Sequence, residues 1–247
     1  MKRLLIPFLI FLSLHALTST ETLLQSAEQA YHKGEKAKNL AERELAFNTA
    51  LKHYLQLEKT YHPNFGNGKL YYNLGNTYFQ LENYPRALYA YTLAHKLDPY
   101  TPRIEQSLKT TLKKLDLPDT PSPFYEQLPL TRLLQIYALL LLITFLCLSL
   151  TIWKKLPRLP SLLSLTLFCL FSLFWLIRFY FIPLEALLIT SSPLYRDAGT
   201  EYTTLTTLPP GASIRVLSLK NNGTWAHVTT PDNTRGYLPT DTFLLFP

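Results

Sequence analysis

The chain is poor in cysteine, with only two such residues among 247, and both fall inside long uncharged stretches. Outside those stretches there is therefore no cysteine for a disulfide, a thiolate nucleophile or a zinc site. A disulfide-stapled scaffold is excluded for the charged parts of the chain. Cys147 and Cys169 are expected to act as small apolar side chains that pack between helices.

Sequence motifs that carry chemistry are also missing. The chain has no G-x-S-x-G, no H-E-x-x-H and no glycine-rich phosphate loop. None of its six histidines pairs with another at the spacing of metal ligands. These absences argue against an enzyme, and the sequence indicates no catalytic residue, no metal and no cofactor.

Net charge is +7, which suggests nucleic-acid binding until the charge is divided along the chain. Residues 21–129 carry 13 Lys or Arg against 12 Asp or Glu, and residues 183–247 carry 4 against 5. The excess lies at the N-terminus and beside the uncharged stretches, where basic residues orient membrane segments. Nucleic acid is therefore not an expected partner.

Charge is absent altogether from residues 133–153 and 159–177. At about 1.5 Å per helical residue, each stretch reaches roughly the 30 Å of a bilayer's hydrocarbon core. A helix satisfies its own backbone hydrogen bonds there, so we predict transmembrane helices over 133–153 and 159–182. Three of the five residues in loop 154–158 are Lys or Arg, which places this loop in the cytoplasm. A buried hairpin in a soluble helical protein is the alternative.

The N-terminus has the pattern of a signal peptide over residues 1–20. Lys2 and Arg3 precede an apolar run, and small residues between Ala16 and Thr20 offer a cleavage region. The cleavage motif is incomplete, so an uncleaved anchor remains the alternative. Either form exports the segment that follows, in agreement with the basic loop.

Residues 21–117 are predicted to be helical, with apolar residues three and four apart. Segment 68–99 matches the signature of the tetratricopeptide repeat, a helix–turn–helix unit of about 34 residues. Small residues such as Gly75 are expected where the two helices cross closely, with aromatic residues such as Tyr91 beside them. The signature positions are Tyr71, Leu74, Gly75, Tyr78, Ala87, Tyr91, Ala94 and Pro99.

The neighbours of this clean repeat are degenerate. Residues 27–34 resemble the end of a first repeat helix, and the charged segment 35–44 is expected to lengthen the connection to the second. Residues 102–114 are predicted to form a capping helix, because one repeat cannot bury its own apolar face. Four prolines then predict a semi-rigid linker over 118–132.

After residue 183 the pattern changes to short β-branched runs separated by turn residues. Five or so strands in about 60 residues favour a small barrel. Residues 183–247 resemble bacterial SH3-like domains in Gly211, in the unit of Gly223, Trp225 and Val228, and in Gly236-Tyr237. Strands are predicted at Leu187–Thr190, Ile214–Leu219, Trp225–Thr229 and Tyr237–Leu238, with hairpin turns at 209–211, 221–223 and 231–233.

This order of parts resembles the BatE-type proteins of the bacterial aerotolerance (Bat) group over nearly the whole chain, most closely in YYNLGNTYFQLENYPRALYAYTLAHKLDP, residues 71–99. The resemblance implies a bacterial inner-membrane protein whose two soluble domains are periplasmic. It implies partners that are membrane proteins with von Willebrand A domains, and a MoxR-type ATPase. It does not imply a defined activity. The irregular first repeat argues against a long peptide groove.

Two surfaces are candidates for binding. The concave face of the clean repeat, which binds extended peptides in this class of repeat, is expected to show Lys69, Tyr72, Asn73, Asn76, Phe79 and Gln80, with Arg103 from the next helix. An ordinary solvated face is the alternative. In the barrel, a groove for glycan or peptide would be lined by Tyr195, Tyr202, Trp225 and Tyr237. Core positions are favoured for Trp225 and Tyr237, because both occupy predicted strands.

The predicted fold class is a multidomain membrane protein: an all-α tetratricopeptide helical repeat, a two-helix transmembrane hairpin and a small all-β SH3-like barrel. The predicted function is a non-enzymatic inner-membrane scaffold or adaptor, in which the repeats dock a protein partner and the barrel adds a second contact. A cell-wall sensor that binds peptidoglycan through the barrel is the alternative.

Overall fold

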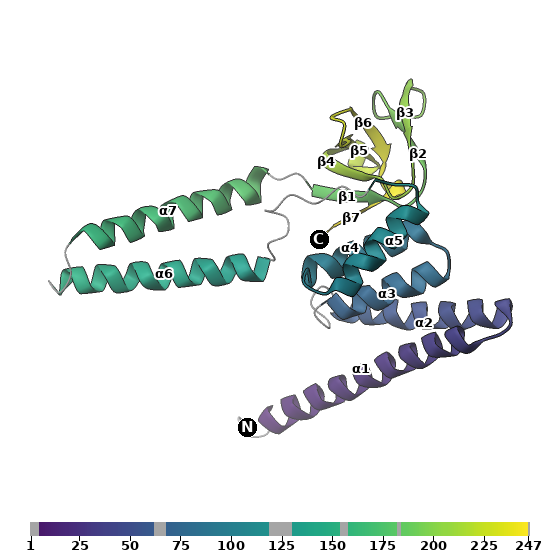
Figure 1. Cartoon of the computed structure of the whole chain (residues 1–247), viewed down its shortest axis with the longest axis horizontal. Helices are drawn as coiled ribbons and strands as arrows, with labels where there is room; N and C mark the ends of the chain where they lie inside the picture. The colour runs from purple at the N-terminus through teal and green to yellow at the C-terminus, as the bar shows by residue number, and fades with distance from the viewer. Residues whose placement is uncertain (1–4, 62–67, 119–129, 154–157, 182–183, 247) are drawn as a thin grey trace. The chain divides into compact units, whose positions relative to one another are not determined.

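The computed structural model describes residues 5–61, 68–118, 130–153, 158–181 and 184–246 (Figure 1). The chain divides into two compact units. The first contains Met1–Asp119 together with Glu185–Pro247, and the second contains Thr120–Leu184. The helical repeats and the C-terminal sheet therefore share one unit, and the long apolar helices form the other.

Five helices make up the N-terminal part of the first unit. Each of the first four packs against the helix that follows it in the sequence. Proline lies in the first turn of the last two helices, where its missing N–H is harmless. The side chain of Asn83 accepts a hydrogen bond from the N–H of Arg86 at the start of α4. The helices are α1 (Leu5–Lys36), α2 (Leu40–Tyr61), α3 (Lys69–Gln80), α4 (Tyr84–Leu97) and α5 (Pro102–Lys114).

The clean repeat consists of α3 and α4, and its close helix crossing is confirmed. A Cβ atom at Gly75 would lie 2.5 Å from the ring of Tyr91, so only glycine allows this approach. Ala87, Leu74 and Ala94 are buried around the crossing. The tetratricopeptide signature therefore reflects side-chain packing. Glycine is required at position 75 because the ring of Tyr91 fills the space beside it.

One prediction about the first repeat is wrong. Residues 35–44 do not lengthen the connection, because α1 continues to Lys36 and α2 begins at Leu40 after a short turn. The side chain of Asn39 accepts a hydrogen bond from the N–H of Ala41, which supplies a partner at the start of α2. The extra residues are good helix formers and lengthen the helices instead. Helix α1 also runs without a break through residues 16–20, and cleavage there stays a prediction.

The C-terminal part of the first unit is an antiparallel sheet with the strand order β3-β2-β6-β5-β4-β1-β7. Four of these strands are predicted from the sequence, and three are not: β2, β3 and β7, which are short and rich in Ser, Thr or Leu. The strands are β1 (Leu184–Leu188), β2 (Ser192–Tyr195), β3 (Thr204–Leu208), β4 (Ser213–Lys220), β5 (Trp225–Thr229), β6 (Arg235–Pro239) and β7 (Phe243–Leu245).

Two of the three predicted hairpin turns are confirmed. Residues 221–223 join the paired strands β4 and β5, with Asn222 at φ 57° and Gly223 at φ 87°. Residues 231–233 join β5 and β6, which also pair. The third turn, 209–211, is not a hairpin, because β3 and β4 are not neighbours in the sheet. It carries the chain from one edge of the sheet to β4.

The core of the sheet is one apolar cluster built from alternate positions of its strands. On β5, for example, Ala226 and Val228 are buried while Trp225 and His227 are only half-buried. The cluster comprises Ala186, Leu188, Leu194, Ile214, Val216, Ala226, Val228, Leu238 and Phe243.

The second unit contains α6 (Leu130–Ile152) and α7 (Arg158–Phe181), which pack side by side. Hydroxyl groups join them: Thr151 and Ser161 share a hydrogen bond of 2.6 Å, and the Thr144 hydroxyl donates to the carbonyl of Ser164 at 3.3 Å. Most of the leucines on both helices are exposed.

One helix among the described residues, Leu134–Ile152, is long and apolar enough to cross a membrane. Leu159–Phe174 in α7 is a shorter apolar stretch, so the second predicted span is not confirmed. By length and composition the first helix favours membrane association, and the topology stays a prediction. The predicted basic loop and the Pro-rich linker lie largely outside the described residues.

Candidate partner-binding surfaces

The α3 face, defined here as Lys69, Tyr72, Asn73, Asn76 and Gln80, carries most of the predicted peptide-binding residues. Their spacing of three and four brings them onto one side of the helix. Lys69 is exposed and the other four are half-buried. Such a surface is partly shielded from water and still open to a ligand.

Tyr91 of α4 supports the centre of the α3 face. Its hydroxyl donates a hydrogen bond of 2.7 Å to Oδ1 of Asn76, and its ring lies 5.8 Å from that of Tyr72. A hydrogen bond also joins Tyr91 to Ser107 of α5. Burial raises the pKa of Tyr91, so the hydroxyl keeps its proton as a donor. Three helices thus hold one amide and one aromatic ring in place.

The first repeat closes one end of the α3 face through residues that the sequence analysis missed. Oε1 of Gln80 accepts a hydrogen bond from the guanidinium of Arg43 on α2, and that guanidinium lies 5.6 Å from the ring centroid of Phe47. Tyr31 of α1 also hydrogen-bonds to Gln80. Gln80 therefore joins the two repeats, which makes it a structural link more than a ligand group. The sequence offered one indication of this contact, because Tyr31 lies near the end of a degenerate repeat helix.

Three of the predicted residues, Phe79, Lys69 and Arg103, lie apart from Tyr72 and Asn76 at the centre of the α3 face. Phe79 packs edge-to-face on Tyr84 at 5.2 Å, at the end of the repeat where α3 turns into α4. Lys69 begins α3 and Arg103 lies in the first turn of α5; both are exposed, and neither forms an ion pair with any residue that the structure describes. They are cations available to a ligand carboxylate.

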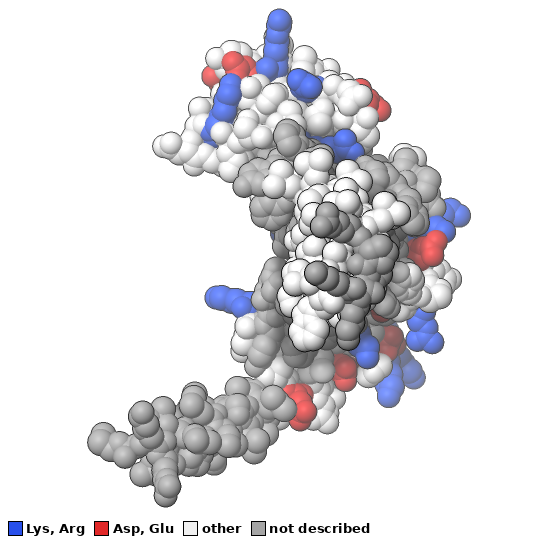
Figure 2. Space-filling view, turned by 90° about the vertical axis from the view of Figure 1, so that its left-hand side faces the viewer, with Lys and Arg blue, Asp and Glu red and all other residues white. Residues whose placement is uncertain are grey.

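On the described part of the face drawn in Figure 2, charge does not single out a nucleic-acid site. On the face drawn in Figure 2, basic and acidic side chains lie interspersed. This distribution matches the near balance of the two charged stretches in the sequence. The hydrogen-bonding and aromatic groups of the α3 face therefore distinguish it more than charge does.

The barrel presents a second surface, the aromatic face, defined as Tyr195, Trp225, His227 and Tyr237. Tyr195 and Trp225 pack edge-to-face at 5.5 Å, and His227 stacks on Tyr237 at 4.8 Å. Tyr195 and Tyr237 are direct partners across β2 and β6. Half-buried rings in contact on adjacent strands form a continuous aromatic surface.

The favoured interpretation of Trp225 and Tyr237 as core residues is wrong, because neither belongs to the core cluster of the sheet. On β5 and β6 the core positions belong to Ala226, Val228 and Leu238, so strand alternation turns Trp225 and Tyr237 outward. The strand assignment was correct, and the choice of face was wrong.

Tyr202 is the predicted groove residue that the structure does not bring to the aromatic face. It lies in the connection between β2 and β3, is 45% exposed, and has no ring contact with another described aromatic residue. His227 was missed, although its spacing of two from Trp225 places both on one side of a strand.

Charged groups border the aromatic face. Nζ of Lys220 lies 4.5 Å from the ring centroid of Tyr237 and 3.5 Å from Oδ1 of Asp197. Its hydrogen bond with Tyr237 raises the pKa of the Lys220 ammonium. Burial lowers the pKa of His227, and the cations of Arg235 and Lys220 act in the same direction, so this imidazole is neutral at pH 7. The face can stack on an apolar ring or chain while Lys220 meets an acceptor.

Two protein-family models match the chain. The model described as tetratricopeptide repeat matches residues 68–100, and the model described as bacterial SH3 domain matches residues 192–243. No curated protein sequence matches the chain. Both matched domains are non-catalytic binding domains that fit an adaptor, and no enzyme family is matched. The matches confirm the two domains and do not test the resemblance to BatE-type proteins.

Proposed function

We propose that this protein is a membrane-anchored adaptor that captures an extended segment of a partner protein on the α3 face. The observation that carries the proposal is the arrangement of Asn76, Tyr72 and Tyr91, in which one hydrogen bond of 2.7 Å and one ring contact pre-order a polar, aromatic surface. Pre-ordering reduces the side-chain entropy that binding would otherwise lose. An ordinary solvated helix face has no such support from the neighbouring helices.

The chemistry of the α3 face suits a peptide backbone. Oδ1 of Asn76 is occupied by Tyr91, which leaves its amide NH₂ group as a donor toward a ligand carbonyl. Asn73, one turn before, offers both a donor and an acceptor. Lys69 and Arg103 can hold a carboxylate, from an acidic side chain or a C-terminus. The proposed ligand is therefore an extended segment with at least one carboxylate.

Membrane anchoring is the second part of the proposal. It is supported by the apolar helix Leu134–Ile152 and by the basic residues between the two uncharged stretches. In this arrangement α6 and α7 both span the inner membrane, the basic loop is cytoplasmic, and both binding domains lie outside the cytoplasm. A partner in the same membrane meets the α3 face at high effective concentration. Membrane proteins with von Willebrand A domains are the partners implied by the resemblance to BatE-type proteins, and an aerotolerance or envelope-stress complex is the implied assembly.

The test uses the full-length protein in its native membrane, with a photo-crosslinking residue at Gln106, an exposed position one turn after Arg103 on α5. Asn73→Ala should reduce the yield of a specific crosslinked partner. Asn48→Ala is a matched control, because Asn48 is an exposed amide on α2. Equal yields from both variants would remove the α3 face from the proposal.

A second candidate function is favoured by the aromatic face of the barrel. Aromatic rings of this kind stack on sugar rings and peptide planes, and cell-wall binding is a role associated with bacterial SH3 domains. The test is co-sedimentation of the purified full-length protein in detergent with insoluble peptidoglycan. Trp225→Ala should release the protein from the pellet, whereas Tyr202→Ala should not. Failure of the unaltered protein to sediment would reject this candidate.

A further inference from the structure

The second half of strand β1 is buried on both sides, which a strand at the surface of a small barrel would not be. Ala186, Leu187 and Leu188 are buried in succession. Ala186 and Leu188 belong to the core of the sheet, as alternation requires. Leu187 faces the other way, is 4% exposed, and belongs to the core cluster of the helices. Something other than the barrel therefore covers its outer side.

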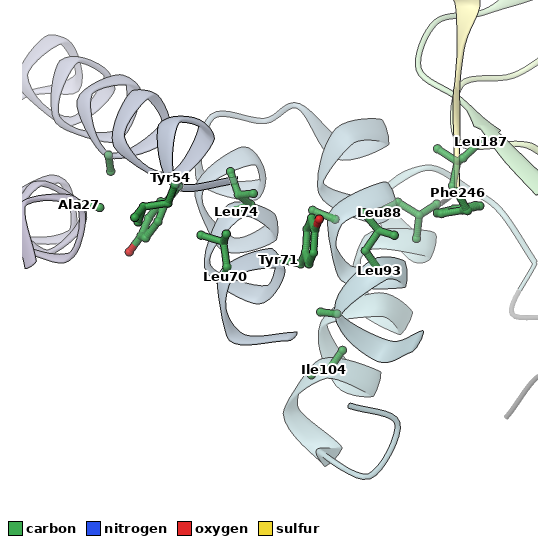
Figure 3. Packing of buried hydrophobic residues seen from close by; sticks show 14 residues of the cluster. Ala27, Tyr54, Leu70, Tyr71, Leu74, Leu88, Leu93, Ile104, Leu187 and Phe246 are labelled. Atoms are coloured by element: carbon green, nitrogen blue, oxygen red, sulfur yellow. The ribbon is translucent and has the colours of Figure 1, made fainter. Parts of the chain in front are cut away.

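The end of the chain repeats this pattern. Phe246 follows β7, is 7% exposed, and also belongs to the helical core. Its N–H donates to the carbonyl of Glu185, so its backbone stays tied to β1. Its ring stacks on Tyr89 of α4, with the centroids 5.0 Å apart and the planes 15° from parallel. Figure 3 shows Phe246 and Leu187 next to Leu88 of α4.

Polar contacts surround this apolar contact. The hydroxyl of Tyr89 donates a hydrogen bond of 2.7 Å to the carbonyl of Leu245. Nζ of Lys96, seven residues further along α4, lies 2.8 Å from a carboxylate oxygen of Glu185 and 4.3 Å from the ring centroid of Phe246. Tyr89 and Lys96 thus hold the edge strand β7 and its neighbour β1 from one side of α4.

A third contact comes from the turn at 209–211. A Cβ atom at Gly211 would lie 2.7 Å from Leu115, 2.8 Å from Leu117 and 3.5 Å from Leu88. The turn therefore fits closely against the residues that follow α5, and its φ of 85° also requires glycine. The connection between β3 and β4 therefore contacts the helical part in addition to β1, β7 and Phe246.

We propose that α4 and the residues after α5 form an intramolecular binding site for the barrel, with Phe246 as the aromatic anchor. The barrel is then the terminal cap of the repeat array, in addition to any ligand that it binds itself. Helix α5 covers only one side of α4, and an array of two repeats needs both sides covered. The proposal does not depend on which partner the α3 face captures.

The first experiment is crosslinking in the full-length membrane-embedded protein, with Cys147→Ser and Cys169→Ser as background. The pair Lys96→Cys and Glu185→Cys should react with a short bismaleimide to give an intrachain crosslink, identified by mass spectrometry. The control pair Lys96→Cys and Asp232→Cys, with an exposed turn residue on the barrel, should not. No crosslink in the first pair, or a crosslink only between two chains, would overturn the proposal.

The second experiment tests the anchor by hydrogen exchange. Truncation of a buried Phe to Ala destabilises by more than the 1.4 kcal/mol that a factor of ten represents, so Phe246→Ala should speed exchange of α4 amides at least about tenfold. Phe246 lies outside the barrel core, so the amides of β5 and β6 should keep their protection. Leu219→Ala, which truncates an exposed leucine on β4, should leave α4 unchanged.

Charge reversal covers the case in which Phe246→Ala disturbs the barrel itself. Lys96→Glu should speed α4 exchange, and Glu185→Lys added to it should restore protection, because the pair is recreated with its signs exchanged. Rescue supports the proposal whatever Phe246→Ala does. Unchanged α4 exchange in Phe246→Ala and in Lys96→Glu would overturn it.

Discussion

The hydroxyl of Tyr91 donates a hydrogen bond of 2.7 Å to Oδ1 of Asn76 across the two helices of the clean repeat. The same tyrosine fills the space above Gly75. One side chain therefore packs the helix crossing with its ring and orders the α3 face with its hydroxyl. Removing the hydroxyl alone separates these two roles.

Tyr91→Phe should destabilise the protein by about 1 kcal/mol, the typical net contribution of a hydrogen bond. The ring still fills the space above Gly75, so the helical repeat should keep its fold. Partner crosslinking through Gln106 should fall, because Asn76 loses the group that orders it. Chemical denaturation followed by circular dichroism measures the first effect. Tyr202→Phe, at an exposed position, is the control; a Tyr91→Phe protein as stable as this control would contradict the structural role.

Gly75→Ala should destabilise the repeat by more than removal of the Tyr91 hydroxyl does. The added Cβ would lie 2.5 Å from the Tyr91 ring, and overpacking of this kind costs about 1–3 kcal/mol. The second change Tyr91→Leu, which replaces the ring with a smaller apolar side chain, should recover part of the loss. Thermal unfolding of the two single variants and the double variant measures the coupling. Purely additive effects would show that the two residues do not share this space.

The repeat was predictable from sequence because its packing is local. Gly75 and Tyr91 lie on consecutive helices joined by a short turn, so their contact imposes a fixed spacing that can be recognised. The same reasoning failed for residues 35–44, because a degenerate repeat has lost the spacing that marks its turn. Helix propensity then described the segment better than the repeat pattern did.

The docking of the barrel on α4 could not be predicted from the sequence in the same way. Tyr89 and Leu245 are joined by a hydrogen bond over 156 positions, and no spacing rule links residues so far apart. One local signal was present: Ala186-Leu187-Leu188 is an unbroken apolar run, and a strand of that kind is buried on both sides. The aromatic face was mistaken for core for a related reason, since alternation identifies two faces of a strand and does not say which one is inside.

The pH dependence of the barrel should follow His227. Its pKa is lowered from 6.5 by burial and by nearby cations, so the folded barrel favours the neutral imidazole. The unfolded chain binds this proton more readily, and the contribution to stability is therefore present above pH 6.5 and lost as the pH falls through the lowered value. Nuclear magnetic resonance titration of the imidazole measures the pKa directly. His227→Phe keeps the stack on Tyr237 and should remove this acid-side loss; an unchanged pH profile would assign the loss to other groups.

Alkaline pH should weaken the helical core and its contact with the barrel. Burial raises the pKa of Tyr71 and of Tyr89 from 10.0 to about 12, and the charge of Glu58 acts in the same direction on both. The folded protein holds these protons to higher pH than the unfolded chain does. Their contribution is therefore complete below pH 10 and is lost as the pH rises toward 12. Urea denaturation of the detergent-solubilised protein between about pH 8 and pH 11, a range that spans the onset of tyrosine ionisation in the unfolded chain, measures the loss.

Tyr89→Phe separates the docking contact from the rest of this alkaline loss. The variant lacks the ionisable hydroxyl and also the hydrogen bond to the carbonyl of Leu245, so it should be less stable than the unaltered protein at pH 8. Its stability should then fall less steeply above pH 10, because only Tyr71 of this pair still ionises. The two stability curves should converge as the pH rises. Parallel curves would mean that Tyr89 ionises alike in the folded and unfolded states. That result would contradict its stacking against Phe246 and its burial at the interface.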